Sequence, residues 1–195
     1  MSIINKSSNK KSGKNAEKFA EDLKKVLKKF KETKLGEYDN INLDYYKTFV
    51  KKKSNFTDKF SVMDECISKL KIAVKEFDNV CTKFTKTFSE GGLLSISNIY
   101  LKKISSGAKQ FYRDLVRLES AENKKICQEN MKKFSKSNNS LRKFIFGAAE
   151  CKVNGVRNSA KIQDEKVKNL MSEIADYLGK FPAVYANYTS ECFTD

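Results

Sequence analysis

The chain has no histidine, and this absence excludes much of enzyme chemistry. Without imidazole there is no Ser-His-Asp or Cys-His machinery, no histidine metal ligand and no side chain that ordinarily titrates near neutral pH. The segment Lys11-Ser12-Gly13-Lys14 lacks the glycine spacing of a phosphate-binding loop. We therefore expect a protein that is not an enzyme, with no catalytic residues, no cofactor and no metal.

Long hydrophobic runs are also absent. The longest runs are a few residues, such as 144–146, whereas a membrane-spanning helix needs about 20 apolar residues. The first residues, MSIINK, contain no apolar stretch of a signal peptide, and Ser2 stands where N-myristoylation requires glycine. The five cysteines are odd in number and form no C-x-x-C pair, which favours buried, reduced thiols. The expected location is the cytoplasm.

Positive charge is abundant and unevenly distributed. The net charge is +15, and residues 1–34 (+7) and 124–161 (+8) carry nearly all of the excess, against +3 for 35–123 and −3 for 162–195. Two basic blocks favour a polyanionic partner, either nucleic acid or an anionic lipid surface. Solvated lysine faces without a specific partner are the simpler alternative.

Apolar residues recur in steps of four and three from Phe56 to Phe88, a pattern typical of a coiled-coil seam with a repeat of about 3.5 residues. The same pattern runs from Leu101 to Leu118 and again from Val156 to Tyr188, where Pro182 is expected to bend the helix near Gly179. Ser89-Glu90-Gly91-Gly92 and the polar stretch 132–140 are the expected turns. The sequence therefore predicts helices at about 37–88, 95–134 and 141–193.

Three long helices joined by tight turns form an elongated antiparallel three-helix coiled coil, each helix on the order of 60–75 Å long. The predicted fold class is all-α, with this rod occupying residues 35–195. Its aromatic-rich stripes are wide for three helices alone, and a two-fold homodimer would bury the spare apolar surface.

Residues 1–34 are predicted to form a disordered basic leader with an amphipathic helix at about 16–31. Its apolar side chains occupy an arc of about 120° on a helical wheel, and lysines cover most of the remainder. Such a helix suits a membrane interface, or calmodulin-like recognition, or the start of the first rod helix. The apolar side chains expected to insert into the membrane are Phe19, Leu23, Val26, Leu27 and Phe30.

Four stretches resemble the BAR domain family, of the amphiphysin or N-BAR type. They are KKVLKKFKETKLGEYDNINLDYY (24–46), EGGLLSISNIYLKKI (90–104), RDLVRLESAENKK (113–125) and LMSEIADYLGKFPAVYANYTSECF (170–193). The chain departs from the family in the shortness of 35–123 and in Leu118-Glu119, where a Tyr-Asp pair is frequent. No further module follows residue 195, so the chain is either a stand-alone protein or a fragment.

The resemblance implies a crescent-shaped homodimer, peripheral to the membrane, that senses or induces membrane curvature in endocytosis or vesicle trafficking. Its partners would be phosphatidylserine or phosphoinositide membranes, a second copy of the chain, and small GTPases or cytoskeletal proteins. The basic block at the second turn would lie at the distal tips. The cationic side chains assigned to membrane binding are Lys18, Lys24, Lys25, Lys28, Lys29, Lys51, Lys52, Lys53, Lys132, Lys133, Lys136, Arg142 and Lys143.

Two other classes of function fit parts of the sequence. A helical nucleic-acid-binding protein also suits the net charge. The excess of 35 lysines over 4 arginines disfavours it, because base readout prefers arginine. The second alternative is a cytoskeletal or trafficking scaffold whose rod binds protein and no lipid.

Overall fold

The computed structural model describes residues 3–33, 35, 56–89, 95–150, 152–153, 156–157 and 165–192, with side-chain environments for 17–33, 35, 64–86, 100–123, 125–146 and 166–186. Within these residues the chain is all-helical apart from one short strand pair. The five helices are α1 (Ile3–Glu32), α4 (Phe56–Ser89), α5 (Ser95–Glu119), α6 (Lys124–Glu150) and α7 (Glu165–Cys192). The strands β1 (Lys152–Val153) and β2 (Val156–Arg157) form a two-residue antiparallel pair between α6 and α7.

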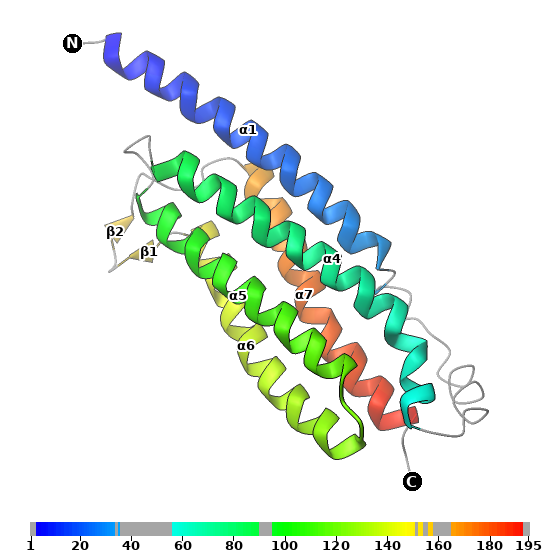
Figure 1. Cartoon of the computed structure of the whole chain (residues 1–195). Helices are drawn as coiled ribbons and strands as arrows, with labels where there is room; N and C mark the ends of the chain where they lie inside the picture. Colours follow the sequence, from blue (N-terminus) through cyan, green and yellow to red (C-terminus); the bar gives the residue numbers. More distant parts are fainter. Residues whose placement is uncertain are drawn as a thin grey trace.

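The five helices close into a ring (Figure 1). Each of α4, α5 and α6 packs on the helices before and after it among these five, and α1 and α7 also contact each other. Pairs of cross-helix contacts show that consecutive helices are antiparallel. On α1 and α4, Asp22 pairs with Lys83 and Lys29 pairs with Glu76. On α6 and α7, Cys127 contacts Tyr185 and Asn138 contacts Leu178. With alternating directions, the first and fifth helices of the ring run parallel.

One continuous core lies inside this ring, and it receives apolar side chains from all five helices. Phe134 on α6 lies 4.6 Å from Phe111 on α5 and 5.7 Å from Phe181 on α7, measured between ring centroids. Such aromatic pairs add about 0.5–1.5 kcal/mol each beyond the area they bury. The aromatic side chains that the structure describes are therefore covered largely within one chain.

The structure differs from the predicted three-helix rod in the number and limits of its helices. The predicted helix 95–134 ends at Glu119, and the predicted turn at 132–140 lies inside α6. The second break comes at 120–123, where Asn123 Oδ1 accepts a 2.9 Å hydrogen bond from Ile126 N and caps α6. The predicted helix 141–193 is divided between α6 and α7.

Polar side chains inside α6 make hydrogen bonds to the helix itself and to neighbouring helices, in place of those they would make in a turn. Ser137 Oγ donates to the carboxylate of Asp114 on α5, at 2.6 Å, and lies 3.1 Å from the carbonyl of Phe134. Asn138 Nδ2 donates to the Leu178 carbonyl on α7, at 2.9 Å, and Ser140 Oγ donates to the Lys136 carbonyl. Cross-helix hydrogen bonds thus stabilise a helix through a stretch of turn-forming residues.

Two other expectations concern α7 and the cysteines. The helix α7 is continuous through Pro182. Cys66, Cys81 and Cys127 are buried and unpaired, as predicted for reduced thiols. The remaining two, Cys151 and Cys192, lie outside the described side chains.

Candidate anionic-surface binding site

The leader helix α1 is packed into the bundle in this structure. The five side chains expected to insert into a membrane are all buried, with Phe19, Leu23 and Phe30 fully inaccessible to solvent. Phe19 lies 4.8 Å from Phe84 on α4, and Phe30 lies 6.2 Å from Tyr177 on α7, between ring centroids. The described apolar stripe of α1 thus covers core, and residues 19–30 of the predicted separate leader (1–34) belong to the same hydrophobic core as the other helices.

The lysines of the described part of α1, residues 17–32, lie on its outer side, among carboxylates. Lys18, Lys24, Lys25 and Lys28 are exposed, whereas Lys29 is half-buried and lies 3.8 Å from Glu76 on α4. Glu17, Glu21, Asp22 and Glu32 share the described part of the helix with them. The positive field over α1 is correspondingly diluted.

Among the described side chains, the largest excess of positive charge lies on the outer side of the α5–α6 pair, which we call the α5–α6 basic face. The side chains that define this face are exposed: Lys102, Lys103, Lys109, Arg113 and Arg117 from α5, and Lys125, Lys132, Lys133, Lys136 and Lys143 from α6. On α6 the spacing 125, 132, 136 and 143 keeps four lysines within an arc of about 40° along about 27 Å of helix. The result is a cationic stripe parallel to a second one on α5.

Carboxylates near this face are few. Asp114 is buried between α5 and α6, where its Oδ2 accepts from Ser137 and its Oδ1 accepts from Gln110 at 3.1 Å; the same Oδ1 lies 3.5 Å from Arg117 Nη1, so this carboxylate compensates one cation of the face. Glu119 points to α4, where its Oε2 lies 2.7 Å from Lys71 Nζ. From Lys125 to Lys143, Glu129 is the single acidic residue of the sequence. Net positive charge therefore persists along the whole face.

Hydrogen bonds hold the two helices that carry this face. Asp114 is the centre of a network that joins α5 to α6, and at the turn Asn130 Nδ2 donates to the Arg117 carbonyl at 3.3 Å. A buried carboxylate with several hydrogen-bond partners fixes the register of the helices that supply them. The lysines consequently project from a defined backbone, although their own side chains reach into solvent.

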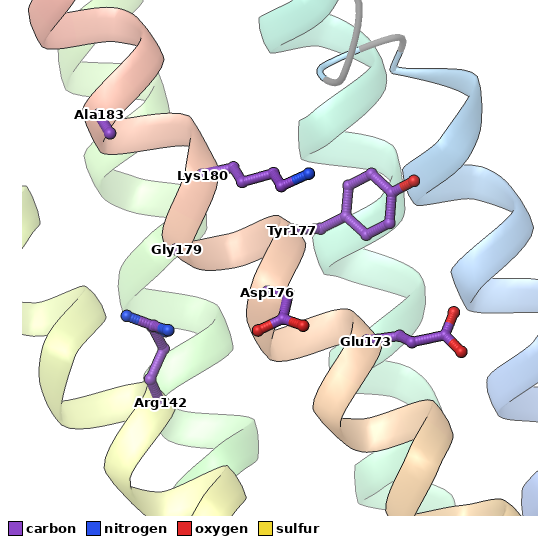
Figure 2. Close-up of a pocket in the computed structure, with 7 residues that line it drawn as sticks. All are labelled: Arg142, Glu173, Asp176, Tyr177, Gly179, Lys180 and Ala183. Atoms are coloured by element: carbon purple, nitrogen blue, oxygen red, sulfur yellow. The ribbon is translucent and has the colours of Figure 1, made fainter. Parts of the chain in front are cut away.

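Arg142 lies apart from the other predicted cations of α6. It lines a groove of about 480 Å³ between α6 and α7 (Figure 2). Its Nε is buried without a hydrogen-bond partner in the described part of the chain, and its guanidinium lies 5.8 Å from the ring centroid of Phe146. A Cβ at Gly179 would lie 2.7 Å from Arg142 Cζ, so the missing side chain makes room for the guanidinium. Arg142 is therefore a packing residue as much as a surface cation.

The structure brings together part of the predicted site. Lys132, Lys133, Lys136 and Lys143 share one exposed face. The α1 lysines lie on another helix that does not pack on α5 or α6 among the principal contacts. Lys51, Lys52 and Lys53 lie outside the described residues.

Sequence reasoning missed the α5 half of the basic face. Its signal was present, because Lys102, Lys109 and Arg113 recur at helical spacing on the side of the helix opposite Leu101, Ile104 and Ala108. The count of charge by segment obscured this signal, since residues 35–123 also contain the acidic groups of α4, which offset the cations of α5 in the sum.

Two other kinds of site are absent from the described residues. Within the described residues no group of three or more acidic, cysteine or histidine side chains is placed to hold a metal ion. None of the described helices combines the length and apolarity needed to cross a bilayer. Comparisons of the chain with protein-family models, with curated proteins and with solved structures find no match.

Proposed function

We propose that this protein binds negatively charged membrane surfaces through the α5–α6 basic face. The observation that carries the proposal is the alignment of exposed lysines on two adjacent antiparallel helices whose described parts carry few carboxylates: Asp114 is buried, Glu119 pairs with Lys71 on α4, and Glu129 is exposed. Each cation near an anionic leaflet contributes about 1 kcal/mol, so several of them acting together give usable affinity.

Lysine as the main cation favours a lipid surface. A lysine ammonium is a point charge on a flexible stem, which suits a fluid array of headgroups, whereas sequence-specific nucleic-acid contacts favour the bidentate arginine fork. The face carries eight lysines and two arginines. Phe146, which is 38% exposed and follows Lys143 by three residues, offers an apolar contact beside the charges.

Co-sedimentation with vesicles tests the proposal. Wild-type protein should sediment with vesicles containing phosphatidylserine, and less so as salt rises, because screening weakens interactions between exposed charges. Neutralising three α6 lysines, with Lys132→Gln, Lys136→Gln and Lys143→Gln, should weaken binding roughly 100-fold, about 1 kcal/mol for each charge.

The matched control neutralises three lysines of α1, with Lys24→Gln, Lys25→Gln and Lys28→Gln. We expect it to weaken binding less than about tenfold, because these charges lie on a different face among carboxylates. Equal loss in both triple variants would contradict the assignment to α5–α6. Equal binding to neutral vesicles would remove the proposal, and a gel shift with nucleic acid tighter than vesicle binding would replace it.

A crescent-shaped homodimer that senses or induces curvature is the finer form of this proposal, and it rests on the family resemblance. Among the described residues the large apolar side chains with substantial exposure are Ile72, Val116, Ile126 and Phe146, of which Ile72 is the most exposed at 55%. Ile72 is the first candidate for a contact between copies. Sedimentation equilibrium should give twice the chain mass, reduced to one chain by Ile72→Asp; a single-chain mass for the wild type would end this finer form.

A further inference from the structure

A groove between α5 and α6 opens on the basic face. It has a volume of about 430 Å³. The described residues that line it include two lysines, Lys102 and Lys103, and no carboxylate. A surface groove lined by charges of one sign raises the local concentration of ligands of the opposite sign.

The floor of this groove is apolar. Gly107 lies at a close approach of α5 to α6, since a Cβ there would lie 2.8 Å from Leu141 Cδ1. Phe144, half-buried, continues the floor along α6. Because Gly107 has no side chain, Leu141 packs directly against α5, and Leu141 and Phe144 give the groove an apolar floor, which favours a ligand that has a hydrocarbon part.

Cations and a hydroxyl gather at one end of the groove. Lys103 Nζ lies 5.4 Å from the ring centroid of Phe144 and 5.9 Å from that of Tyr100, which holds the ammonium at the edge of the floor. Lys102 is exposed beside it, and Ser106 lines the groove without a hydrogen-bond partner in the described part of the chain. These groups can donate hydrogen bonds to a phosphate.

We propose that the groove binds one anionic phospholipid, with the lipid phosphate between Lys102, Lys103 and Ser106. The glycerol and the first acyl carbons lie over Gly107, Leu141 and Phe144. The inference rests on the proposed membrane binding and adds a defined lipid site to a diffuse electrostatic one. An inorganic phosphate would leave the apolar floor uncovered, whereas a neutral hydrocarbon would leave the lysines without a counter-charge. The surrounding lysines, Lys109, Lys136 and Lys143, would hold the groove at an anionic leaflet.

A short-chain lipid separates this site from the bilayer. Dihexanoyl phosphatidylserine, added as monomer below its micelle concentration, should shift backbone amide resonances of 102–107 and 140–144 in ¹⁵N spectra of the full chain. Ser140→Phe fills the groove without changing charge and should weaken binding at least tenfold, since the floor is no longer accessible. Asn139→Phe is the matched control, because residue 139 is the exposed neighbour outside the lining.

A second variant guards against misfolding. Lys102→Gln with Lys103→Gln keeps the groove open and should weaken binding by a similar factor, while far-ultraviolet circular dichroism and the thermal midpoint stay near those of wild type. Unchanged affinity in both variants would overturn the site. Equal binding of dihexanoyl phosphatidylcholine, or the same resonance shifts with inorganic phosphate alone, would also overturn it.

The two proposals fail in different ways. Sedimentation with phosphatidylserine vesicles but no resonance shift with the short-chain lipid would leave the basic face as the membrane contact and exclude the groove as a lipid site. Resonance shifts at the groove without vesicle sedimentation at low salt would exclude the membrane role. They would also overturn the proposal that the lipid in the groove comes from a bilayer.

Discussion

Helices α1 and α6 are similar in sequence character but differ in what their outer faces offer. Each carries six basic residues among those whose side chains are described, and each buries an apolar stripe in the common core. The described part of α1 also carries four acidic residues, whereas that of α6 carries one. Ion pairs to α4 engage Asp22 and Lys29 of α1.

The comparison shows that amphipathicity alone does not identify a membrane-binding helix. An apolar stripe backed by lysines suits a bilayer interface and a protein core equally well, because both environments exclude water from one side of the helix. The fraction of the cationic charge left without a nearby carboxylate is the more informative property. By that measure α6, with α5 beside it, is the membrane-facing candidate.

The largest expected effect separates the two helices by stability. Phe19→Ala removes a fully buried ring from α1 and should lower the free energy of unfolding by about 3–5 kcal/mol. Phe146→Ala on α6 removes a partly exposed ring and should change it by less than about 1 kcal/mol while weakening vesicle binding. Urea denaturation measures the first quantity; a small loss for Phe19→Ala would mean that α1 is not docked in solution.

A second change makes α6 resemble α1. Gln128→Glu with Asn139→Glu adds two carboxylates beside the exposed lysines and should weaken binding to acidic vesicles by about 2 kcal/mol, roughly 30-fold. The reciprocal variant, Glu17→Gln with Glu21→Gln on α1, should change binding by no more than a few-fold. If the α1 variant gains as much as the α6 variant loses, the two faces are equivalent and the distinction fails.

The Asp114 network gives a smaller effect. Asp114→Ala leaves Ser137 and Gln110 without their shared acceptor and should lower the free energy of unfolding by about 1–2 kcal/mol. Faster amide hydrogen exchange should be confined first to α5 and α6, with α1 following at the global rate. Uniform acceleration along the chain would show that the network does not specifically hold the basic face.

The smallest expected effect is an absence of reaction at Cys81. Burial, and secondarily the charge of Asp78, raises the pKa of the Cys81 thiol, so the reactive thiolate is scarce at pH 8 in the folded protein. Burial likewise raises the pKa of Cys66 to about 12, which makes it an internal standard on the same helix. Cys81 lies in the core between Phe77 and Phe84, and Phe84 contacts Phe19 of α1. Alkylation of Cys81 therefore reports whether α1 has detached from the bundle.

We expect Cys81 to stay unlabelled by N-ethylmaleimide at pH 8 with and without acidic vesicles, and to react in urea, as read by mass spectrometry of its peptide. Labelling of Cys81 on vesicles with Cys66 still protected would show that α1 detaches on the membrane. The prediction that Phe19, Leu23, Val26, Leu27 and Phe30 insert into lipid would then apply to the bound state.

The helical class and most apolar faces could be predicted from the sequence, because the three-four recurrence of α4, α5 and α7 is local information. The break at 120–123 was also readable in principle, since Asn123 is a good helix cap. The continuity of α6 was not: Ser137 and Asn138 favour a turn in isolation, and their partners, Asp114 and the Leu178 carbonyl, are brought near only by the assembled fold. Long-range contacts likewise determine that the apolar stripe of α1 packs against α4 and α7.

The candidate site was predictable to a lesser extent. Lys132, Lys133, Lys136 and Lys143 were found from charge density, which needs no structure. The α5 lysines required knowledge that α5 and α6 lie side by side, and the groove at Gly107 required the distance between their backbones. Arg142 was assigned to the surface because sequence cannot show that Gly179 leaves space for its guanidinium.

The contact between α1 and α7 joins two helices that are far apart in the sequence, so α1 leaves the ribosome well before α7 is made. Phe30 must wait for Tyr177 to be synthesised, which takes roughly 7–30 s at typical translation rates. During that interval the part of the apolar stripe of α1 that contacts α7 is uncovered and accessible to chaperones. Any shortened product ending before Glu165 would leave it uncovered, and such fragments should be the most readily degraded or aggregated forms of this polypeptide.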